Sequence, residues 1–493
     1  MKGLVLALLT AVALGCGGSR PRPEDPAPRE APDAGAPDAD AGPEDAGPPD
    51  AGPAEEEPAD AGPPPPPRDP LPPPADHLAL GAAFACFGHV DGRVACWGSN
   101  RFGQLGDPEL GLGARARRTE AAYVAGVRAR RVEAGSWHAC ALGEDGGVRC
   151  WGHGAWGQLG DGEREDRSAP VEVAGLEDVV QLALGEGHGC ARTAERRLHC
   201  WGRNHMGQLG DGTTENRLAP VTVPLEEVVD VAAGRAHSCA RTADGRVWCW
   251  GENLDGQLGD GSRGAPAGHR ASPAAVEGVE SELHLAAGGG ASCAWGDEGA
   301  WCWGRNDSWQ LRARPAGEPE SAVLRPARVH AGPVREVALG GRHTCLLRPV
   351  EGEASEGAGG AEAEDDAGAE ATDGAATPEP NGVGEAEAAE AEDAREPAEP
   401  ELEVLCVGLN HRGQLGDGSR RLRRDWVRVE RLRRPRELGA GTEFGCARIE
   451  RGVRCWGDNR SGQLADGTRR FRTAPVPVQG LRFERDAGIE AAR

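Results

Sequence analysis

The side chains with the clearest chemical potential are the cysteines, because they recur at a fixed spacing. The chain has 15 of them, and 14 fall into pairs whose members are 9, 10 or, once, 61 residues apart. The pairs are Cys86–Cys96, Cys140–Cys150, Cys190–Cys200, Cys239–Cys249, Cys293–Cys302, Cys345–Cys406 and Cys446–Cys455. Each close pair flanks a hairpin turn, so its members should face each other on adjacent strands at a distance that suits a disulfide. We therefore predict seven disulfides.

Two alternatives compete with the disulfides. Reduced cysteines as small buried residues would be the default in a cytosolic protein. Zinc is the other alternative, because a histidine precedes the first cysteine by two residues in four pairs (His138, His188, His237 and His343). Tetrahedral zinc needs four converging ligands, and the other three pairs have Phe84, Ala291 and Phe444 at this position. We expect no metal and no cofactor.

The cysteines belong to a repeat of about 50 residues. A repeat contains an apolar run, G-x-x-H-x-C-A, a hinge phrase CWG-x-N-x-x-GQLGDG and a closing APV-x-V, and the hinge phrase occurs seven times. Short Val- and Leu-rich runs bounded by Gly, Asp and Pro, together with Asp-Gly turns, indicate strands. Repeats of this length are typical of propeller blades. The sequence predicts an all-β, seven-bladed β-propeller over residues 77–493.

The two ends of the repeat array suggest how the ring closes. The array begins at His77 without a preceding APV-x-V run, and residues 474–478 supply such a run at the other end. We expect this C-terminal strand to complete the first blade, which would remove exposed strand edges.

The hinge phrase, with G-x-x-H-x-C-A before it, resembles the regulator-of-chromosome-condensation (RCC-type) repeat over about 360 residues. The resemblance implies a seven-bladed propeller. The family's eukaryotic archetype is a guanine-nucleotide exchange factor, but its partner-contacting residues lie in variable loops, so the motif carries none of them to this chain. A secreted bacterial propeller inhibitor that grips another protein with one face is the better analogue.

The recurring residues are interpreted as framework. Six tryptophans should fill the space between blades: Trp97, Trp151, Trp201, Trp250, Trp303 and Trp456. Repeat five has Trp309-Gln310-Leu311-Arg312 in place of G-Q-L-G, and repeat six has Val407 in place of the tryptophan. Blades five and six should therefore be the least regular.

The N-terminus predicts export. One lysine and a short apolar run, too short to span a bilayer, precede Leu14-Gly15-Cys16, which resembles a bacterial lipobox. We interpret 1–16 as a lipoprotein signal peptide ending at a lipidated Cys16, with ordinary signal cleavage as the alternative. Gly17 follows the cysteine, so we expect a lipid anchor in the bacterial cell envelope, at the outer membrane.

Two low-complexity segments carry most of the acidity. Residues 17–76 have 15 acidic residues against four arginines, and residues 351–403 have 19 against one. Neither composition can bury a core. We interpret 17–76 as a disordered tether and 351–403 as a disordered insertion in the hairpin of the sixth blade.

One arginine-rich segment, residues 420–436, contains nine arginines: Arg420, Arg421, Arg423, Arg424, Arg428, Arg431, Arg433, Arg434 and Arg436. It is a solvated basic face or a polyanion site for polysaccharide, lipid phosphate or nucleic acid. We hypothesise an intramolecular contact between this segment and the acidic insertion.

Catalytic motifs are absent from the sequence. A propeller hydrolase would need a tyrosine and arginines at the central channel, but Tyr123, the only tyrosine, lies in an irregular stretch between strands. There is no G-x-S-x-G and no H-E-x-x-H. We expect a monomeric, non-enzymatic scaffold that presents loops to an unknown envelope or extracellular protein and meets the membrane only through its lipid. Polyanion binding, nucleotide exchange and a propeller hydrolase are the alternatives.

Overall fold

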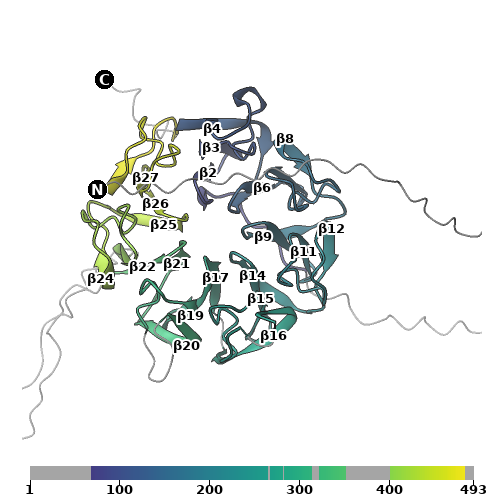
Figure 1. The fold of residues 1–493 in the computed structure, drawn as a ribbon. Coiled ribbons are helices and arrows are strands. Elements are labelled where there is room, and N and C mark those ends of the chain that lie inside the picture. Colours follow the sequence, from purple (N-terminus) through teal and green to yellow (C-terminus); the bar gives the residue numbers. More distant parts are fainter. Residues whose placement is uncertain (1–67, 265–266, 281–282, 314–320, 351–399, 484–493) are drawn as a thin grey trace, which may run out of the picture. The chain divides into compact units, whose positions relative to one another are not determined.

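The computed structural model describes residues 68–264, 267–280, 283–313, 321–350 and 400–483. These residues form seven four-stranded antiparallel sheets that surround a central axis (Figure 1). Apart from one 3-10 turn, η1 (Pro108–Leu110), the described residues contain no helix. The predicted seven-bladed β-propeller is confirmed. The signal peptide 1–16, Cys16 and most of the tether lie outside the described residues.

Each blade is built from four consecutive strands. The first four blades contain β1 (His77–Leu80), β2 (Phe84–Gly88), β3 (Arg93–Ser99) and β4 (Arg117–Arg128); β5 (Arg131–Ala134), β6 (His138–Leu142), β7 (Val148–Gly152) and β8 (Arg167–Glu172); β9 (Val179–Leu184), β10 (His188–Thr193), β11 (Leu198–Gly202) and β12 (Arg217–Thr222); and β13 (Val228–Ala233), β14 (His237–Thr242), β15 (Arg246–Glu252) and β16 (His269–Glu280). The last three contain β17 (His284–Gly288), β18 (Ala291–Gly296), β19 (Gly299–Arg305) and β20 (Ala322–Ala331); β21 (Glu336–Leu339), β22 (His343–Pro349), β23 (Leu402–Gly408) and β24 (Arg423–Arg428); and β25 (Pro435–Ala440), β26 (Phe444–Ile449), β27 (Gly452–Gly457) and β28 (Arg472–Pro477).

The antiparallel order gives the propeller two different faces. Each blade starts with its inner strand, and the ends of all seven inner strands line a central cavity. The turn after the first strand and the hinge-phrase loop after the third strand therefore lie on one face, which we call the loop face. The hairpin between the second and third strands and the connection to the next blade lie on the opposite face, which we call the hairpin face.

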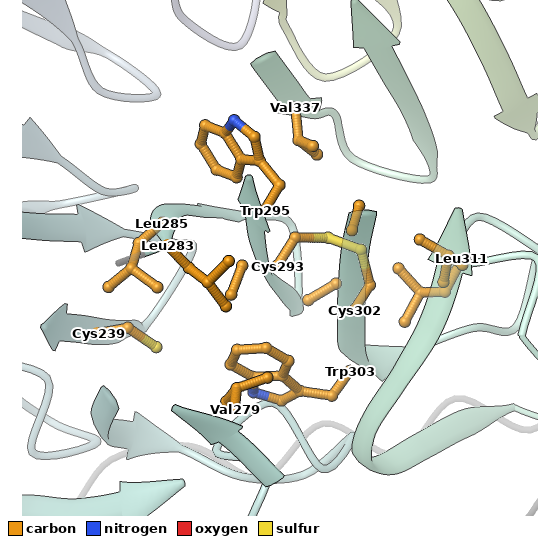
Figure 2. Close-up of a cluster of buried hydrophobic side chains, with 14 of the residues drawn as sticks. Cys239, Val279, Leu283, Leu285, Cys293, Trp295, Cys302, Trp303, Leu311 and Val337 are labelled. Atoms are coloured by element: carbon orange, nitrogen blue, oxygen red, sulfur yellow. A yellow bond between two sulfur atoms is a disulfide. The ribbon is translucent and has the colours of Figure 1, made fainter. Parts of the chain in front are cut away.

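In six of the seven seams, a tryptophan forms a hydrogen bond to the preceding blade. Six indole Nε1 atoms donate to the backbone oxygen of the hinge-phrase glutamine in the preceding blade at 2.9–3.0 Å. These are the six predicted framework tryptophans, and all are fully buried. Figure 2 shows one such seam, between blades 4 and 5, where Trp303 lies beside Val279 in a cluster that includes the Cys293–Cys302 disulfide.

The seam between blades 5 and 6 is built differently. Val407 is buried where the other seams have tryptophan. At the outer edge of this seam, Trp426 Nε1 donates to the backbone oxygen of Val329 at 3.2 Å, and the Arg424 guanidinium lies 4.8 Å from the centre of the Trp309 ring. An outer tryptophan thus replaces the missing inner one.

The hinge loop of repeat five keeps its shape without its glycines. Trp309 and Arg312 adopt φ angles of 60° and 54°, the left-handed region that Gly103 and Gly106 occupy in the first blade. Leu311 N still donates to Asn306 Oδ1 at 3.0 Å. The irregularity expected here is therefore backbone strain rather than a lost loop.

The expectation that the C-terminal strand completes the first blade is wrong. β28 pairs with β27 in the seventh blade, and the first blade has its own fourth strand, β4. The predicted boundary between repeats lies in the wrong place. Each APV-x-V run pairs with the CWG strand before it and not with the apolar strand that follows. The seam closes instead by contacts, which include Trp97 Nε1 to Gln463 O at 2.9 Å and Ala121 N to Gln479 O at 2.9 Å.

Two predicted segment boundaries also differ. Leu402 and Glu403, assigned to the insertion, are the first residues of β23, and Val350 N donates to Glu401 O at 2.7 Å. At the other end, residues 68–76 of the predicted tether contact the hairpin face. Asp69 N donates to Ala194 O at 2.9 Å, and the Asp69 carboxylate pairs with Arg192 and Arg196. The local composition could not indicate the contacts of Asp69, because their partners are more than 100 residues away in the sequence.

Candidate functional site

The hinge phrase builds the same loop on every blade. The glutamine Oε1 accepts the backbone N–H of the residue two positions earlier at 2.8–2.9 Å in all seven blades. In six blades the asparagine Oδ1 also accepts the N–H of the buried leucine at 2.9–3.2 Å. The residue two positions before the glutamine takes part in these bonds only through its backbone N–H. Its side chain can therefore vary without disturbing the loop.

That variable position divides the loop face into two halves. Blades 1–3 carry Phe102, Trp156 and Met206 there, whereas blades 4–7 carry Asp255, Ser308, Arg412 and Ser461. The apolar residues therefore gather on three consecutive blades.

Aromatic and arginine side chains extend this apolar half into an arc over blades 1–3. The ring of Phe102 lies 4.5 Å from that of His153 and 5.8 Å from that of Trp137. The His153 ring lies 4.8 Å from the Trp156 ring, and Arg203 covers Trp156 at 4.4 Å. We call these five residues the aromatic arc. All are partly exposed, although the surroundings of His153 are buried enough to lower the pKa of its imidazole.

A cavity of about 580 Å³ opens beside the arc, at the axis. Its wall is mostly backbone and small side chains, because every inner strand ends in glycine at this point. The charged residues on its wall are Glu186, Arg235, Arg305, Arg342 and Glu443. They come from blades 3 to 7, so blades 1 and 2 add no charge to the mouth.

The charges at the mouth are paired rather than free. Glu186 contacts Arg203 at 3.4 Å and Arg235 at 3.2 Å. Asp307 contacts Arg305 at 2.6 Å; burial alone would raise the pKa of its carboxyl, but Arg305 and Arg342 outweigh burial and lower that pKa. Within the described residues, these charges at the mouth are held in ion pairs.

Three acids lie on the inner strands: Glu133 is one residue before the cavity-lining Ala134, and Glu336 and Glu437 are farther from the cavity. Burial raises the pKa of Glu133 and of Glu437 to about 7, and it raises the pKa of Glu336 as well. Glu437 Oε1 accepts Leu78 N at 3.0 Å, and Glu336 Oε2 accepts Leu438 N at 2.7 Å. Glu336 and Glu437 thus link neighbouring inner strands.

The histidines of the repeat also join blades. His188 Nε2 is 2.9 Å from Ser238 Oγ, and His237 Nε2 is 2.9 Å from Ser292 Oγ, each hydroxyl belonging to the next blade. Burial lowers the pKa of His188 to about 3 and that of His237 to about 4, so both imidazoles are neutral at pH 7. These contacts give the histidines a structural role.

The same pairing fails where one partner is missing. His138 and His343 face blades that carry Gly189 and Gly445, and neither ring nitrogen of either histidine has a hydrogen-bond partner among the described residues. Ala291 replaces the histidine of blade 5, and the buried Thr344 hydroxyl of blade 6 is unpaired in turn.

The cysteine pairs lie where the sequence placed them. All seven form disulfides, with Cα atoms 4.0–4.1 Å apart. Cys345 and Cys406 face each other in register although the insertion separates them. Among the described residues, no group of three or more His, Cys, Asp and Glu side chains is placed to hold a metal ion.

The arginine-rich segment does not form a single patch. The strand β24 runs between the two faces, so Arg420, Arg421, Arg423 and Arg424 lie at its loop-face end, whereas Arg428 and the arginines that follow it lie toward the hairpin face. Several of these arginines form ion pairs: Arg423 with Asp417, Arg428 with Glu403 and Arg434 with Glu450.

Tyr123 lies in β4, the outer strand of blade 1, rather than in an irregular stretch. Its hydroxyl is 3.3 Å from His89 Nε2 and accepts Arg482 N at 3.4 Å. This position is away from the central cavity, whose lining does not include it.

Sequence reasoning missed the aromatic arc. Its residues lie in three repeats, and none stands out within its own repeat. Aligning the seven hinge phrases by their glutamine would have revealed the change from Phe, Trp and Met to polar residues.

No helix among the residues that the structure describes is long and apolar enough to cross a bilayer.

Known proteins resemble this chain in sequence and fold. The family model for the RCC1-like domain matches residues 42–346. The ultraviolet-B receptor UVR8 of Arabidopsis thaliana is 34% identical over 110 residues, 22% of this chain and 24% of the receptor. RCC1 domain-containing protein 1 of Mus musculus is 34% identical over 105 residues, 21% of this chain and 26% of that protein. The alignments thus span about a quarter of each relative.

Solved structures share the fold. Human WBSCR16 superposes with a TM-score of 0.60 at 20% identity, covering 78% of this chain and 94% of that one. Prp20p of Saccharomyces cerevisiae, whose structure was described with its binding properties to Gsp1p and histones, superposes with a TM-score of 0.56 at 19% identity, covering 75% and 81%. At these identities the likeness concerns the fold alone.

Proposed function

This chain belongs to the RCC1-like domain family, and from that premise we propose that it is a non-enzymatic scaffold that binds a protein partner through the aromatic arc. The partner is an envelope or extracellular protein. The propeller that binds it is exported and is anchored by a lipid on Cys16.

The composition of the arc carries this proposal. Tryptophan and arginine are enriched among the residues that dominate protein–protein binding energy, and such residues cluster at the centre of an interface. Here Trp137, Trp156 and Arg203 converge with Phe102 beside a polar, ion-paired mouth. An apolar centre with a charged border is the usual anatomy of such an interface.

The framework supports the same reading. Phe102 and Trp156 project from hinge loops whose backbone is held by the hinge-phrase glutamine and, in blade 1, also by Asn100. Binding residues are commonly found on loops that a rigid scaffold positions. A partner meeting a preformed surface loses less conformational entropy on binding.

An enzyme fits the described residues less well. The carboxylates at the mouth are held in ion pairs, and Tyr123 is remote from the cavity. Nucleotide exchange would rest on family analogy alone.

The test uses the full chain with a photo-crosslinking residue in place of Met206, next to the arc, in its native envelope. We expect one dominant crosslinked protein, identified by mass spectrometry and then titrated in purified form by calorimetry. Phe102→Ala with Trp156→Ala should weaken its binding at least about 30-fold, since the truncation of even one hot-spot residue costs about 2 kcal/mol or more.

The matched control is Trp301→Ala, which removes another partly exposed tryptophan, one that lies in a third strand rather than in a hinge loop. It should leave the affinity unchanged. Equal losses from both variants, or no loss from the arc variant, would refute the assignment of this surface.

A further inference from the structure

Three consecutive hinge loops carry an unusual concentration of arginine at the rim of the loop face. Blade 6 reads Arg420-Arg421-Leu422-Arg423-Arg424, blade 7 reads Arg469-Arg470-Phe471-Arg472, and blade 1 has Arg115, Arg117 and Arg118 after Leu112. We call residues 112–118, 420–424 and 469–472 the basic rim.

The three loops are physically continuous. Gly418 N of blade 6 donates to Thr473 O of blade 7 at 2.9 Å, and Gly467 N of blade 7 donates to Thr119 O of blade 1 at 3.0 Å. The Arg420 guanidinium lies 4.8 Å from the centre of the Phe471 ring in the next blade. The basic rim is therefore one surface across three blades, and it includes the ring-closing seam.

Most of its positive charge is not neutralised. One arginine per loop is committed to a hinge-phrase aspartate: Arg118 to Asp107, Arg423 to Asp417 and Arg472 to Asp466. The other seven arginines have no carboxylate partner among the described residues: Arg115, Arg117, Arg420, Arg421, Arg424, Arg469 and Arg470. The acid that directly follows this stretch of blade 6, Asp425, pairs with Arg312.

The equivalent loops of blades 2 and 3 have the opposite character. The blade 2 loop carries Glu163, Glu165 and Asp166 besides its hinge aspartate, against two arginines. The blade 3 loop carries Glu215 with one arginine, which is paired with Asp211. The loops of blades 2, 3, 6 and 7 have the same length between the hinge aspartate and the arginine that pairs with it, so the fold does not require the additional arginines of blades 6 and 7.

Exposed apolar side chains are interleaved with these arginines. Leu112, Leu422 and Phe471 are 55%, 42% and 41% exposed, and they are three of the six exposed large hydrophobic residues among those described. A purely electrostatic polyanion site gains nothing from exposed leucines. Arginines beside exposed Leu and Phe instead match the interface of a bilayer, where apolar side chains enter the headgroup region and cations meet lipid phosphates.

We propose that the basic rim binds the surface of a membrane containing anionic phospholipids. The guanidinium groups pair with lipid phosphates, for which their fork geometry is suited, and Leu112, Leu422 and Phe471 enter the interface. The basic rim shares no residue with the aromatic arc, most of which lies on blade 2, and its contact with the membrane does not depend on any lipid on Cys16.

The test measures binding to vesicles by co-sedimentation. The full chain carries Cys16→Ser, so that no acyl chain contributes, and is mixed with vesicles of phosphatidylcholine with or without phosphatidylglycerol. We expect binding only to the anionic vesicles and weaker binding as salt increases.

Two variants separate charge from apolar contact. Arg421→Glu with Arg470→Glu should reduce vesicle affinity at least about tenfold, because each basic residue near an anionic surface contributes about a factor of five. Leu422→Ser with Phe471→Ser should reduce it about tenfold as well, through loss of apolar insertion. The matched control, Arg149→Glu with Arg164→Glu, reverses two exposed arginines of blade 2 and should have little effect.

Several results would overturn the proposal: no binding to anionic vesicles, equal loss from the control, or unchanged vesicle binding by the Leu422 and Phe471 variant. Tight binding of a short DNA oligonucleotide that survives the loss of Leu422 and Phe471, without vesicle binding, would mark the rim as a nucleic-acid site instead. Equal melting temperatures of all variants ensure that a loss reflects the surface and not unfolding.

Discussion

The side-chain hydroxyl of the residue directly before the first cysteine of a repeat should have opposite effects on stability in blades 4 and 6. Ser238 and Thr344 occupy equivalent positions, and both are buried. Ser238 Oγ bonds His188 Nε2 at 2.9 Å and donates to Gln208 O at 2.9 Å. Thr344 Oγ1 has no partner among the described residues, because Ala291 stands where a histidine would reach it.

The magnitude follows from which atoms are left without a partner. Ser238→Ala leaves His188 Nε2 buried and unpaired, whereas Gln208 O keeps the hydrogen bond from Trp250 Nε1. One orphaned buried polar group costs about 1–3 kcal/mol. Thr344→Val keeps the shape and removes an unpaired hydroxyl, so we expect it to be neutral or to stabilise by about 1 kcal/mol.

The assay is guanidinium unfolding at pH 7 with the disulfides intact, followed by tryptophan fluorescence. A single transition with an unchanged slope is required before free energies are compared. Equal destabilisation by Ser238→Ala and Thr344→Val would refute the reasoning, since the hydroxyls would then act through packing rather than through the histidine.

Three further predictions test other parts of the chain. Glu133→Gln should stabilise the propeller at pH 8 by roughly 1–3 kcal/mol and much less at pH 5, measured by unfolding at both pH values. The pKa of Glu133 in the folded protein, about 7, lies above its usual 4.5. This group therefore favours the fold below pH 4.5 and loses that contribution as the pH rises through 7. A pH-independent effect would contradict the burial of this acid. Asp69→Ala should release the strap formed by residues 68–76, because Arg192 and Arg196 lose their shared carboxylate. Hydrogen exchange of the residue 69 amide, which donates to Ala194 O, should accelerate while the blades stay protected. Unchanged protection of this amide would show that the strap is held by other contacts. The intact mass of the mature protein from its native membrane should show acyl chains on Cys16 and 14 thiols that react only after reduction; an unprocessed chain with free thiols would refute the predicted export.

The fold could be read from the sequence because repetition multiplies a weak local signal. A single short strand is ambiguous, but seven hinge phrases at a common spacing fix the number of blades, and cysteines such as Cys140 and Cys150 fix the register of each hairpin. The signal failed at the ends of the array. An APV-x-V run lies between two apolar strands, and local sequence does not say which neighbour it pairs with.

The aromatic arc and the basic rim could not be read from one repeat. Each contains residues from several blades, and their proximity is set by the ring. Trp156 and Arg203 are 47 residues apart, and Arg420 and Phe471 are 51 apart, yet each pair is in contact. The nine arginines of residues 420–436 show the opposite case, in which residues that are close in sequence lie apart in space. The strand β24 crosses from one face to the other and separates them.

The sequence by itself determined the number of blades, the cysteine pairing and the buried framework, because these follow from local patterns that recur with one period. Tertiary structure alone decided how the ring closes, which histidines have partners and which variable residues share a face. These features depend on what the next blade places opposite each side chain. In a propeller that neighbour lies about 50 residues away, beyond the reach of any pattern within one repeat.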